Sequence, residues 1–468
     1  MSPLPSASPP AFDAALLARY DVRGPRYTSY PTALQFDARF TESDYRECIA
    51  ESNADPVPAP LSLYVHVPFC ERLCYYCACT KLITRDRRRA AAYLDALGIE
   101  LRRQAALFSP DRRVEQIHWG GGTPTFLSFE EMAALMDTTR RCFRLAPDAE
   151  GEFSIEVDPR TIGADAVAPL RTLGFNRLSL GVQDFDERVQ AAVNRIQPAR
   201  LTLDIMAAAR RAGFRSISVD LIYGLPRQSV SSFERTLEHI VAAAPDRISV
   251  FNYAHLPDQF RAQRLIAARE LPDPAEKLRI LQATIERLTA GGYRHVGMDH
   301  FAKETDELCR AQDEGTLART FQGYSTHGDC DIVGLGMSAI SAVGDCYSQN
   351  GRRLRAYMEL VDDGRFPVER GVRLTEDDRV RRSIIGDLIC GLRADGRWFH
   401  DRYGREFWDY FGEERGLLRP LEDDGLVEIQ ADGLRVTPRG RLLVRNVCMV
   451  FDRHLRERPG AGRYSRAI

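Results

Sequence analysis

Four cysteines crowded into ten residues set the first limit on how this chain can fold. Cys70, Cys74, Cys77 and Cys79 are spaced C-x3-C-x2-C-x-C. They directly follow residues 61–67, an apolar and β-branched run that predicts a strand. A strand that leads into a loop of thiols can hold a metal at the edge of a sheet. The rest of the chain must therefore supply a sheet around this loop.

Strand and helix patterns alternate after this point. Apolar runs predict strands at 63–67, 114–119, 153–157, 177–180, 216–220 and 247–251. Helical spacing appears between them, at 87–107, 129–143, 164–173, from 185 past 200, and at 230–243. Such an alternation predicts a parallel sheet of the α/β class. Six units rather than eight indicate a partial (β/α)6 barrel, open on one side, with its chemistry at the C-terminal ends of the strands.

The remaining segments are less regular. A helical hairpin, broken at 271–274 and ending near 288, precedes one more strand at 293–298. The glycine-rich stretch 321–344 is too irregular for a helix. Helical spacing returns from 375, and two short strands, 425–429 and 434–436, flank an Asp-Gly turn before a closing helix at 439–453. This last pattern predicts a mainly helical, winged-helix-like C-terminal domain.

The domain boundaries follow from these patterns, and 468 residues suit two or three domains at ~150 residues each. We expect an N-terminal arm at 1–60, the partial barrel at 61–300, a glycine-rich segment packing on the barrel opening at 301–365, and the helical domain at 366–468. Within the arm, the aromatic, proline-bounded residues 24–32 suit either a packed surface segment or a flap over a ligand. Residues 1–10 and those after 453 have the composition of disordered ends.

Charge and hydropathy exclude several classes of protein. Sixty-four Lys and Arg residues nearly balance 66 Asp and Glu residues, so bulk charge does not favour nucleic-acid binding. The longest apolar runs, such as 333–344, are shorter than the ~20 residues that span a bilayer. The N-terminus lacks a signal-peptide pattern. These features predict a cytoplasmic enzyme with no membrane span.

The seven remaining cysteines are scattered singly through the chain. Without a signal peptide a disulfide framework is not expected, and isolated cysteines are usually small buried hydrophobes. They are Cys48, Cys142, Cys309, Cys330, Cys346, Cys390 and Cys448.

Three kinds of site compete for the clustered cysteines. Structural zinc normally uses two ligand pairs separated by a dozen or more residues, and this cluster is too compact for that pattern. A redox pair could use Cys74 and Cys77, but it would leave Cys70 unexplained. An iron–sulfur cluster uses closely spaced thiolates, and C-x3-C-x2-C would supply three ligands and leave one iron free to bind a substrate or cofactor.

At this point the sequence resembles a known family. C-x3-C-x2-C after the first strand of a partial barrel is similar to the radical S-adenosylmethionine (radical SAM) superfamily. Further motifs resemble the oxygen-independent coproporphyrinogen III oxidases, also called coproporphyrinogen dehydrogenases, from about residue 20 to the C-terminal Tyr-Ser-Arg. These motifs lie at 26–32, 64–69, 118–125, 156–159, 252–257, 321–324 and 344–347, together with Cys79.

The resemblance implies a set of cofactor ligands. Cys70, Cys74 and Cys77 would hold a [4Fe-4S] cluster, whereas Cys79 matches a family cysteine that is not a ligand. Two molecules of S-adenosylmethionine are implied. The first would contact Tyr64, Gly121, Glu156 and Ile340. The second would contact Tyr76, Gly122, Thr123, Gln183, Arg195, Asp220 and Ala254.

The resemblance also implies a reaction. A 5′-deoxyadenosyl radical would remove hydrogen from two propionate side chains of coproporphyrinogen III, and loss of CO₂ would leave the vinyl groups of protoporphyrinogen IX in haem biosynthesis. No side chain need act as a general acid or base, because the cofactor carries the difficult step. Arg26 is a candidate for meeting a propionate. An electron donor and an electron acceptor are required, no nucleic acid is expected, and the chain is expected to be a monomer.

Two other functions compete with this one. Haem chaperones share the radical SAM fold and cluster motif, but they lack the Tyr-Thr-Ser-Tyr-Pro-Thr arm and the fourth cysteine, and they carry a His-Asn-x-x-Tyr-Trp motif that is absent here. A structural zinc or nucleic-acid-binding module could instead be built on the winged C-terminus, and a metal analysis that finds zinc without sulfide would favour it.

Overall fold

The computed structural model describes residues 10–457 and 464–466. These residues form two compact units. We call residues 36–273 and 329–374 the barrel unit, and the other described residues the helical unit. The disordered ends expected at 1–10 and after 453 lie mostly outside the described residues.

Six parallel strands form the centre of the barrel unit, as the sequence predicts. Their order in the sheet is β9-β8-β7-β6-β4-β1, so each strand lies beside its neighbour in the chain. Their bounds are β1 Leu61–Val67, β4 Arg113–Gly121, β6 Glu152–Val157, β7 Arg177–Gln183, β8 Ser216–Tyr223 and β9 Arg247–Asn252. The predicted (β/α)6 class is confirmed.

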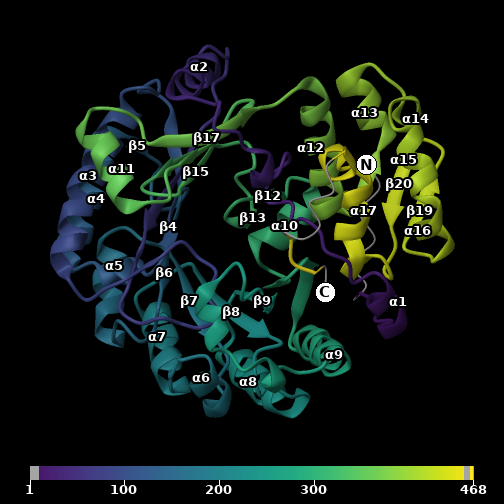
Figure 1. The fold of residues 1–468 in the computed structure, drawn as a ribbon, viewed down its shortest axis with the longest axis horizontal. Helices are drawn as coiled ribbons and strands as arrows, with labels where there is room; N and C mark the ends of the chain where they lie inside the picture. Colours follow the sequence, from purple (N-terminus) through teal and green to yellow (C-terminus); the bar gives the residue numbers. More distant parts are fainter. Residues whose placement is uncertain (1–9, 458–463, 467–468) are drawn as a thin grey trace. The chain divides into compact units, whose positions relative to one another are not determined.

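Helices cover the outer side of these strands (Figure 1). They are α3 Arg87–Ala105, α4 Phe129–Cys142, α5 Val167–Thr172, α6 Glu187–Ala192, α7 Ala199–Arg211 and α8 Val230–Ala243. In α3 the residues Tyr93, Leu97 and Leu101 are buried at helical spacing. Ser128 and Glu131 form a capping box that begins α4. The long helix expected from 185 past 200 is two helices, α6 and α7, separated by a segment that contains Pro198.

The glycine-rich stretch departs from the prediction. Within the barrel unit it forms β14 Asp331–Leu335 and β15 Ile340–Val343, followed by β16 Cys346–Asn350, α11 Leu354–Asp362 and β17 Val368–Arg373. Strand β14 pairs in parallel with β1 and is buried along its whole length, so it extends the sheet. A buried ion pair between Arg112 and Asp331, at 2.6 Å, fixes its start.

The barrel unit also contains shorter elements. Before β1 the chain forms α2 Glu42–Asn53, which was not predicted, although Thr41 and Asp44 form a capping box at its start. The others are β2 Phe69–Cys70, β3 Leu82–Ile83, β5 Arg144–Leu145 and the 3-10 turns Pro124–Phe126, Ala164–Ala166, Arg261–Leu265 and Ala268–Glu270. The predicted helical hairpin that ends near residue 288 is therefore wrong in its first arm. That arm contains only the 3-10 turns Arg261–Leu265 and Ala268–Glu270.

The helical unit has its own hydrophobic core. Its largest helix in the C-terminal part is α12 Glu376–Gly391, and β19 Val427–Gln430 pairs antiparallel with β20 Gly433–Val436, which confirms the predicted hairpin. Strand β18 Arg393–Asp395 completes that small sheet. The closing segment is α17 Val444–Phe451 and α18 Arg453–Glu457.

The other elements of the helical unit come from three parts of the chain. They are α1 Ala14–Arg19, a 3-10 turn Ala33–Gln35, α9 Pro274–Ala290, β10 Tyr293–Gly297, β11 His300–Lys303, α10 Glu307–Glu314, β12 Ala318–Thr320, β13 Gly323–Ser325, α13 Gly396–Tyr403, α14 Phe407–Tyr410, α15 Gly412–Leu417, α16 Arg419–Asp423 and a 3-10 turn Arg441–Leu443. Over the described residues, no helix has both the length and the apolar character that a membrane crossing requires.

Two of the isolated cysteines correct an expectation. Cys48 on α2 and Cys346 on β16 form a disulfide, although their sequence separation is 298 residues. No spacing rule indicates such a pair, because only the fold brings α2 against β16. Cys309, Cys390 and Cys448 are buried and unpaired, as predicted for small hydrophobes.

Candidate metal and cofactor site

The cysteine loop begins where β1 ends. Strand β2 pairs in parallel with β3, so that Cys70 lies beside Ile83, and the backbone N–H of Thr84 donates to the carbonyl of Cys70 at 2.9 Å. The hydroxyl of Thr123, after β4, lies 3.4 Å from the Cys70 sulfur. The loop is therefore held from both sides by backbone pairing and by the end of the neighbouring strand.

The thiols of the loop influence one another. Burial raises the pKa of Cys70 to about 11, and the neighbouring Cys77 and Cys74 add to this effect. A hydrogen bond with Cys79 lowers the pKa of Cys77 to about 6, and the pKa of Cys79 is raised by the same contact. The fourth thiol is thus a direct neighbour of Cys77.

Two buried arginines converge on Cys74. The guanidinium of Arg160 donates to the Cys74 sulfur at 3.2 Å, and that of Arg195 donates to it at 3.6 Å. Both cations also pair with Asp158, at 2.6 and 3.2 Å, and the three side chains are each no more than 10% exposed. Burial would raise the pKa of Asp158, but the charges and hydrogen bonds of Arg195 and Arg160 lower it to about 2.

The charges of these residues fit a negatively charged iron–sulfur cluster together with a further anionic group. Nη1 of Arg160 and Nε of Arg195 are buried and have no hydrogen-bond partner among the described residues. Two buried guanidiniums with one carboxylate leave positive charge that a thiolate-bound cluster, or the carboxylate of S-adenosylmethionine, would balance.

A single zinc ion fits less well. Thiolates bound to one zinc at ~2.3 Å lie ~3.8 Å apart. In the described part of the chain, no three sulfur atoms of the loop lie within 4.8 Å of one another. The loop is therefore too open for the ligands of one ion.

A second group of side chains lies at the ends of β1, β4 and β6. Their register places Tyr64 beside His118, and His118 beside Ser154. Glu156 accepts from His118 at 3.1 Å and from the backbone N–H of Gly121 at 3.2 Å. Burial favours the neutral acid, yet these donors lower the pKa of Glu156 below its usual value. The carboxylate is thus held ionised at the strand ends.

The glycines after β4 are required by close contacts. A Cβ atom on Gly121, whose φ is +110°, would lie 2.5 Å from the ring of His66, and one on Gly122 would lie 2.6 Å from the backbone of Pro68. A side chain at either position would push the cysteine loop away from β4. The glycines therefore keep the loop against the strand ends.

The other predicted contact residues also lie in the barrel unit. Asp220, on β8, is paired in register with Gly181 of β7, and burial together with the charge of Glu156 raises its pKa to about 7. Arg195 donates to the carbonyl of Gly181 at 2.5 Å. Gln183 ends β7, Tyr76 lies in the loop, Ala254 follows β9 and Ile340 begins β15.

Sequence reasoning missed three residues of this site: His66, Asp158 and Arg160. The ring of His66 lies 3.1 Å from the hydroxyl of Tyr64 and 3.0 Å from the carbonyl of Thr80. Asp158 follows Glu156 by two residues, the spacing that places side chains on one side of a strand, so it could have been proposed. No spacing of this kind in the sequence points to Arg160.

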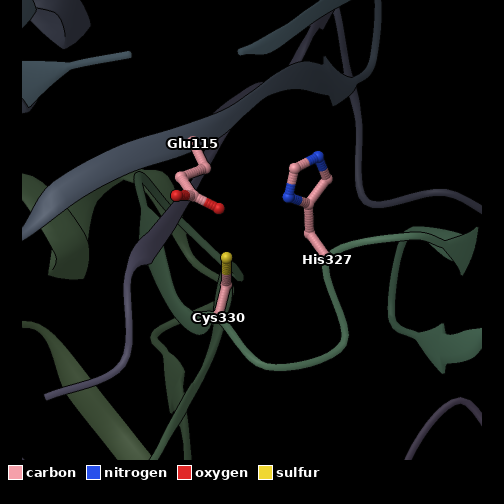
Figure 2. Close-up of side chains that lie close together, drawn as sticks. All are labelled: Glu115, His327 and Cys330. Carbon is pink, nitrogen blue, oxygen red and sulfur yellow. The ribbon is translucent and has the colours of Figure 1, made fainter. Parts of the chain in front are cut away.

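Two further residues have partners elsewhere. Arg26, the candidate for a propionate, pairs with Asp299 within the helical unit. Cys330 lies before β14, and its sulfur is within 4.8 Å of a carboxylate oxygen of Glu115 on β4 (Figure 2). Burial and the nearby Asp329 and Glu115 raise the pKa of the Cys330 thiol, which keeps it protonated.

Comparisons with known proteins cover nearly the whole chain. The profile of the radical SAM superfamily matches residues 64–240, and that of the HemN C-terminal domain matches residues 374–443. An oxygen-independent coproporphyrinogen III oxidase from Escherichia coli strain K12 is 50% identical over 98% of both chains. Its namesake from Pseudomonas aeruginosa is 50% identical over 95% of this chain and 96% of its own. The one from Synechocystis is 43% identical over 98% of both chains.

A solved structure agrees as well. Coproporphyrinogen III oxidase (HemN) from Escherichia coli, described as a radical SAM enzyme, matches with a TM-score of 0.91 and 48% identity. The match covers 96% of this chain and 100% of the solved chain.

Proposed function

This chain belongs to the family of oxygen-independent coproporphyrinogen III oxidases of the radical SAM superfamily, and we propose that it carries out that reaction at the strand ends of its barrel unit. It is an oxidoreductase of haem biosynthesis that uses a [4Fe-4S] cluster and S-adenosylmethionine. The observation that carries this conclusion is the 50% identity over 98% of both chains, which leaves only about 2% of either sequence unmatched.

Cys70, Cys74 and Cys77 are the ligands that we propose for the cluster. The compact C-x3-C-x2-C spacing supports this set, as do the buried guanidiniums of Arg160 and Arg195 beside Cys74. When bound, the cluster and S-adenosylmethionine supply a 5′-deoxyadenosyl radical. Cys79 is proposed to remain a thiol that hydrogen-bonds with Cys77.

The strand-end side chains are proposed to bind S-adenosylmethionine. The ionised Glu156 suits an ammonium group or ribose hydroxyls, and Arg195 can form two hydrogen bonds with a carboxylate. Tyr64, Gly121 and Ile340 would share the first molecule with Glu156. A second molecule would contact Arg195 and the remaining predicted residues, Tyr76, Gly122, Thr123, Gln183, Asp220 and Ala254.

The substrate is proposed to lose two carboxyl groups. Each propionate of coproporphyrinogen III that reacts loses a hydrogen atom from its β-carbon, one electron to an acceptor and CO₂, and a vinyl group remains. The protein would bind and orient the porphyrinogen while excluding competing reactions. Arg26 stays a candidate for a propionate contact, although its present partner is Asp299.

The experiment that tests the site is anaerobic cluster reconstitution. We expect about four iron and four sulfide per chain, and 5′-deoxyadenosine when S-adenosylmethionine and dithionite are added. A protein that binds zinc without sulfide, or that holds a full cluster but never cleaves S-adenosylmethionine, would contradict the proposal. The monomeric state, the cytoplasmic location and the need for an electron donor and an electron acceptor stay predictions.

A further inference from the structure

A cluster of cationic side chains surrounds the cysteine loop. Residues 70–89 contain six of them and only two carboxylates, Glu71 and Asp86, in a chain whose net charge is −2. We call the six residues the basic patch. They are Arg72, Lys81, Arg85, Arg87, Arg88 and Arg89.

The fold brings the basic patch against the proposed cluster ligands. Lys81 donates from its ammonium to the carbonyl of Cys77 at 2.9 Å. Arg85 and Arg87 follow β3, which pairs with the strand that contains Cys70. Arg72 stands inside the loop, between Cys70 and Cys74. The patch therefore lies on the outer side of the loop that would hold the cluster.

Two of these six cations are paired within the segment, Arg87 with Glu71 at 3.4 Å and Arg88 with Asp86 at 3.0 Å, so the six cations and two carboxylates leave a net charge of +4. Arg72, Arg85, Arg87, Arg88 and Arg89 are all exposed, and the side chain of Arg88 is 91% exposed. Neither Arg72 nor Arg85 has an ion-pair partner among the described residues. An apolar side chain, Ile83, lies in the same segment and is 43% exposed. A charged rim around a small apolar contact is typical of a protein docking surface.

The position of the arginines has a cost for the helix. Arg87, Arg88 and Arg89 form the first turn of α3, where the macrodipole favours acidic side chains, and that turn contains none. Cations there typically cost a few tenths of a kcal/mol each. Asp86 caps the helix and offsets part of the repulsion.

From these observations we propose that the basic patch docks an acidic one-electron carrier protein that reduces the cluster. This inference rests on the proposed function, which requires an electron from outside the chain. In the step, one electron leaves the reduced carrier and enters the cluster held by Cys70, Cys74 and Cys77. The carrier is oxidised by one electron, the cluster is reduced by one, and no proton or bond is exchanged.

The charge distribution suits this partner. Opposite charges on two surfaces speed their encounter, and this effect weakens as salt rises. Electron-transfer complexes are small and transient, so a patch of a few side chains is large enough. Ile83, the exposed apolar residue of this surface, is the strand partner of Cys70. A carrier that docks here would therefore lie close to a proposed cluster ligand.

The test compares two double charge reversals. Arg85→Glu/Arg89→Glu alters the basic patch, and Arg144→Glu/Arg211→Glu makes the same change in charge at the opposite edge of the sheet, where both arginines are exposed. The probe is a reduced acidic flavodoxin. Its binding to the protein with and without cluster is measured, together with 5′-deoxyadenosine formation driven by flavodoxin or by dithionite.

We expect the patch variant to lose about tenfold in flavodoxin affinity and in flavodoxin-driven rate, since several charge contacts of up to ~1 kcal/mol are reversed. Its dithionite-driven rate should equal that of wild type, and the control pair should change neither. Glutamate at position 89 suits the helix dipole, so the variant should melt no lower than wild type.

The outcomes separate the two proposals. Equal flavodoxin binding by wild type, patch variant and control would overturn the docking proposal. So would loss of binding to an RNA oligonucleotide in the patch variant while flavodoxin binding is kept, because the patch would then serve nucleic acid. Absence of 5′-deoxyadenosine with dithionite in wild type would contradict the proposed function instead, and the binding measurement would still decide the role of the patch.

Discussion

Asp158 balances the two buried cations beside Cys74. Its carboxylate pairs with Arg160 and Arg195, and all three side chains are almost fully buried. Removing one partner of a buried ionic group leaves the other charges uncompensated, which costs far more than the pair itself contributes. The residue therefore holds the cations in place on the side of the loop where the cluster would bind.

Replacing Asp158 tests this balance. We expect Asp158→Asn to lower the free energy of unfolding of the apo-protein by about 3 kcal/mol. Asp148→Asn is the matched control, because the ion pair of Asp148 with Arg171 is partly exposed, at 51% and 27%, and should cost under ~1 kcal/mol. Denaturant titrations measure both values. Equal losses of unfolding free energy in the two variants would mean that the buried network of Asp158 contributes no more to stability than the ion pair of Asp148.

The cysteine series tests the ligand assignment. Cys70→Ser, Cys74→Ser and Cys77→Ser should each abolish the cluster, because each removes one of three thiolate ligands. Cys79→Ser should retain it, since that thiol is proposed only to hydrogen-bond with Cys77. Iron and sulfide analysis with electron paramagnetic resonance reports the result. A cluster lost in Cys79→Ser would require a four-cysteine assignment.

Much of the site at the residue scale was accessible to sequence reasoning. The family resemblance proposed Glu156 and Asp220 as contacts without a structure, and both lie on parallel strands of the barrel unit, β6 and β8. The contact of Arg160 with Cys74 was not accessible, because it joins the end of β6 to a loop 86 residues earlier in the chain. A contact between residues so far apart in the sequence depends on where the fold places both backbone segments.

Among the elements, α3 and the turn after β14 are joined by a buried carboxylate. Glu100 on α3 accepts from the hydroxyl of Tyr357 at 2.6 Å, from the backbone N–H of Gly336 at 2.8 Å and from the amide of Asn350 at 2.7 Å. The same turn leads into β15, which begins at Ile340. Glu100 thus anchors the strand that carries one proposed cofactor contact.

Stability should depend on pH through Glu100. Burial raises its pKa from 4.5 to about 7. Because the folded state keeps the proton that the unfolded state releases, the contribution of Glu100 to stability is largest below pH 4.5 and falls by about 3 kcal/mol as pH rises through 7. Glu100→Gln should lose that slope. Its amide oxygen can replace Oε2, which accepts from both Tyr357 and Gly336, at the expense of the contact between Oε1 and Asn350.

Unfolding free energies at pH 5 and pH 8 give the slope. Subtracting the variant from wild type isolates Glu100 from other titrating groups. Glu234→Gln, at an exposed position of α8, serves as the control and should keep the wild-type slope. A wild-type slope that persists in Glu100→Gln would show that this carboxyl does not titrate in the range.

The disulfide between α2 and β16 leads to a second prediction about contacts between secondary-structure elements. Denatured protein prepared without reductant should contain nine free thiols, not eleven. Cys48→Ala should give ten, because Cys346 loses its partner, while Cys142→Ala should give eight. Thiol titration with Ellman's reagent counts them. Eleven thiols in the wild type would mean that the pair is reduced in the protein as isolated.

Strands were predictable from the sequence where their apolar runs were continuous. All six barrel strands were located to within a few residues, since strands buried on both faces contain nearly unbroken apolar runs. Strand β14 was missed because its glycine-rich sequence resembles a loop, and its pairing with β1 joins residues far apart in the chain. Helix α2 was not predicted because only three of its 12 residues, Tyr45, Cys48 and Ile49, are buried, which leaves little apolar periodicity in the sequence.

At the scale of the whole molecule, the barrel unit contains every residue proposed for the cluster and for S-adenosylmethionine. The family relationship extends over both units, as the 98% coverage of the relatives requires. The chemistry that starts the reaction is proposed to take place at one edge of the barrel sheet, where its parallel strands end.

We propose that coproporphyrinogen III is converted to protoporphyrinogen IX at this edge of the sheet. The most direct measurement is chromatography of the porphyrins after anaerobic incubation of reconstituted protein with coproporphyrinogen III, S-adenosylmethionine and dithionite, with an electron acceptor added. We predict protoporphyrinogen IX in wild type and none in Cys74→Ser. Production of 5′-deoxyadenosine by a fully loaded cluster, with coproporphyrinogen III left unchanged, would contradict the substrate assignment.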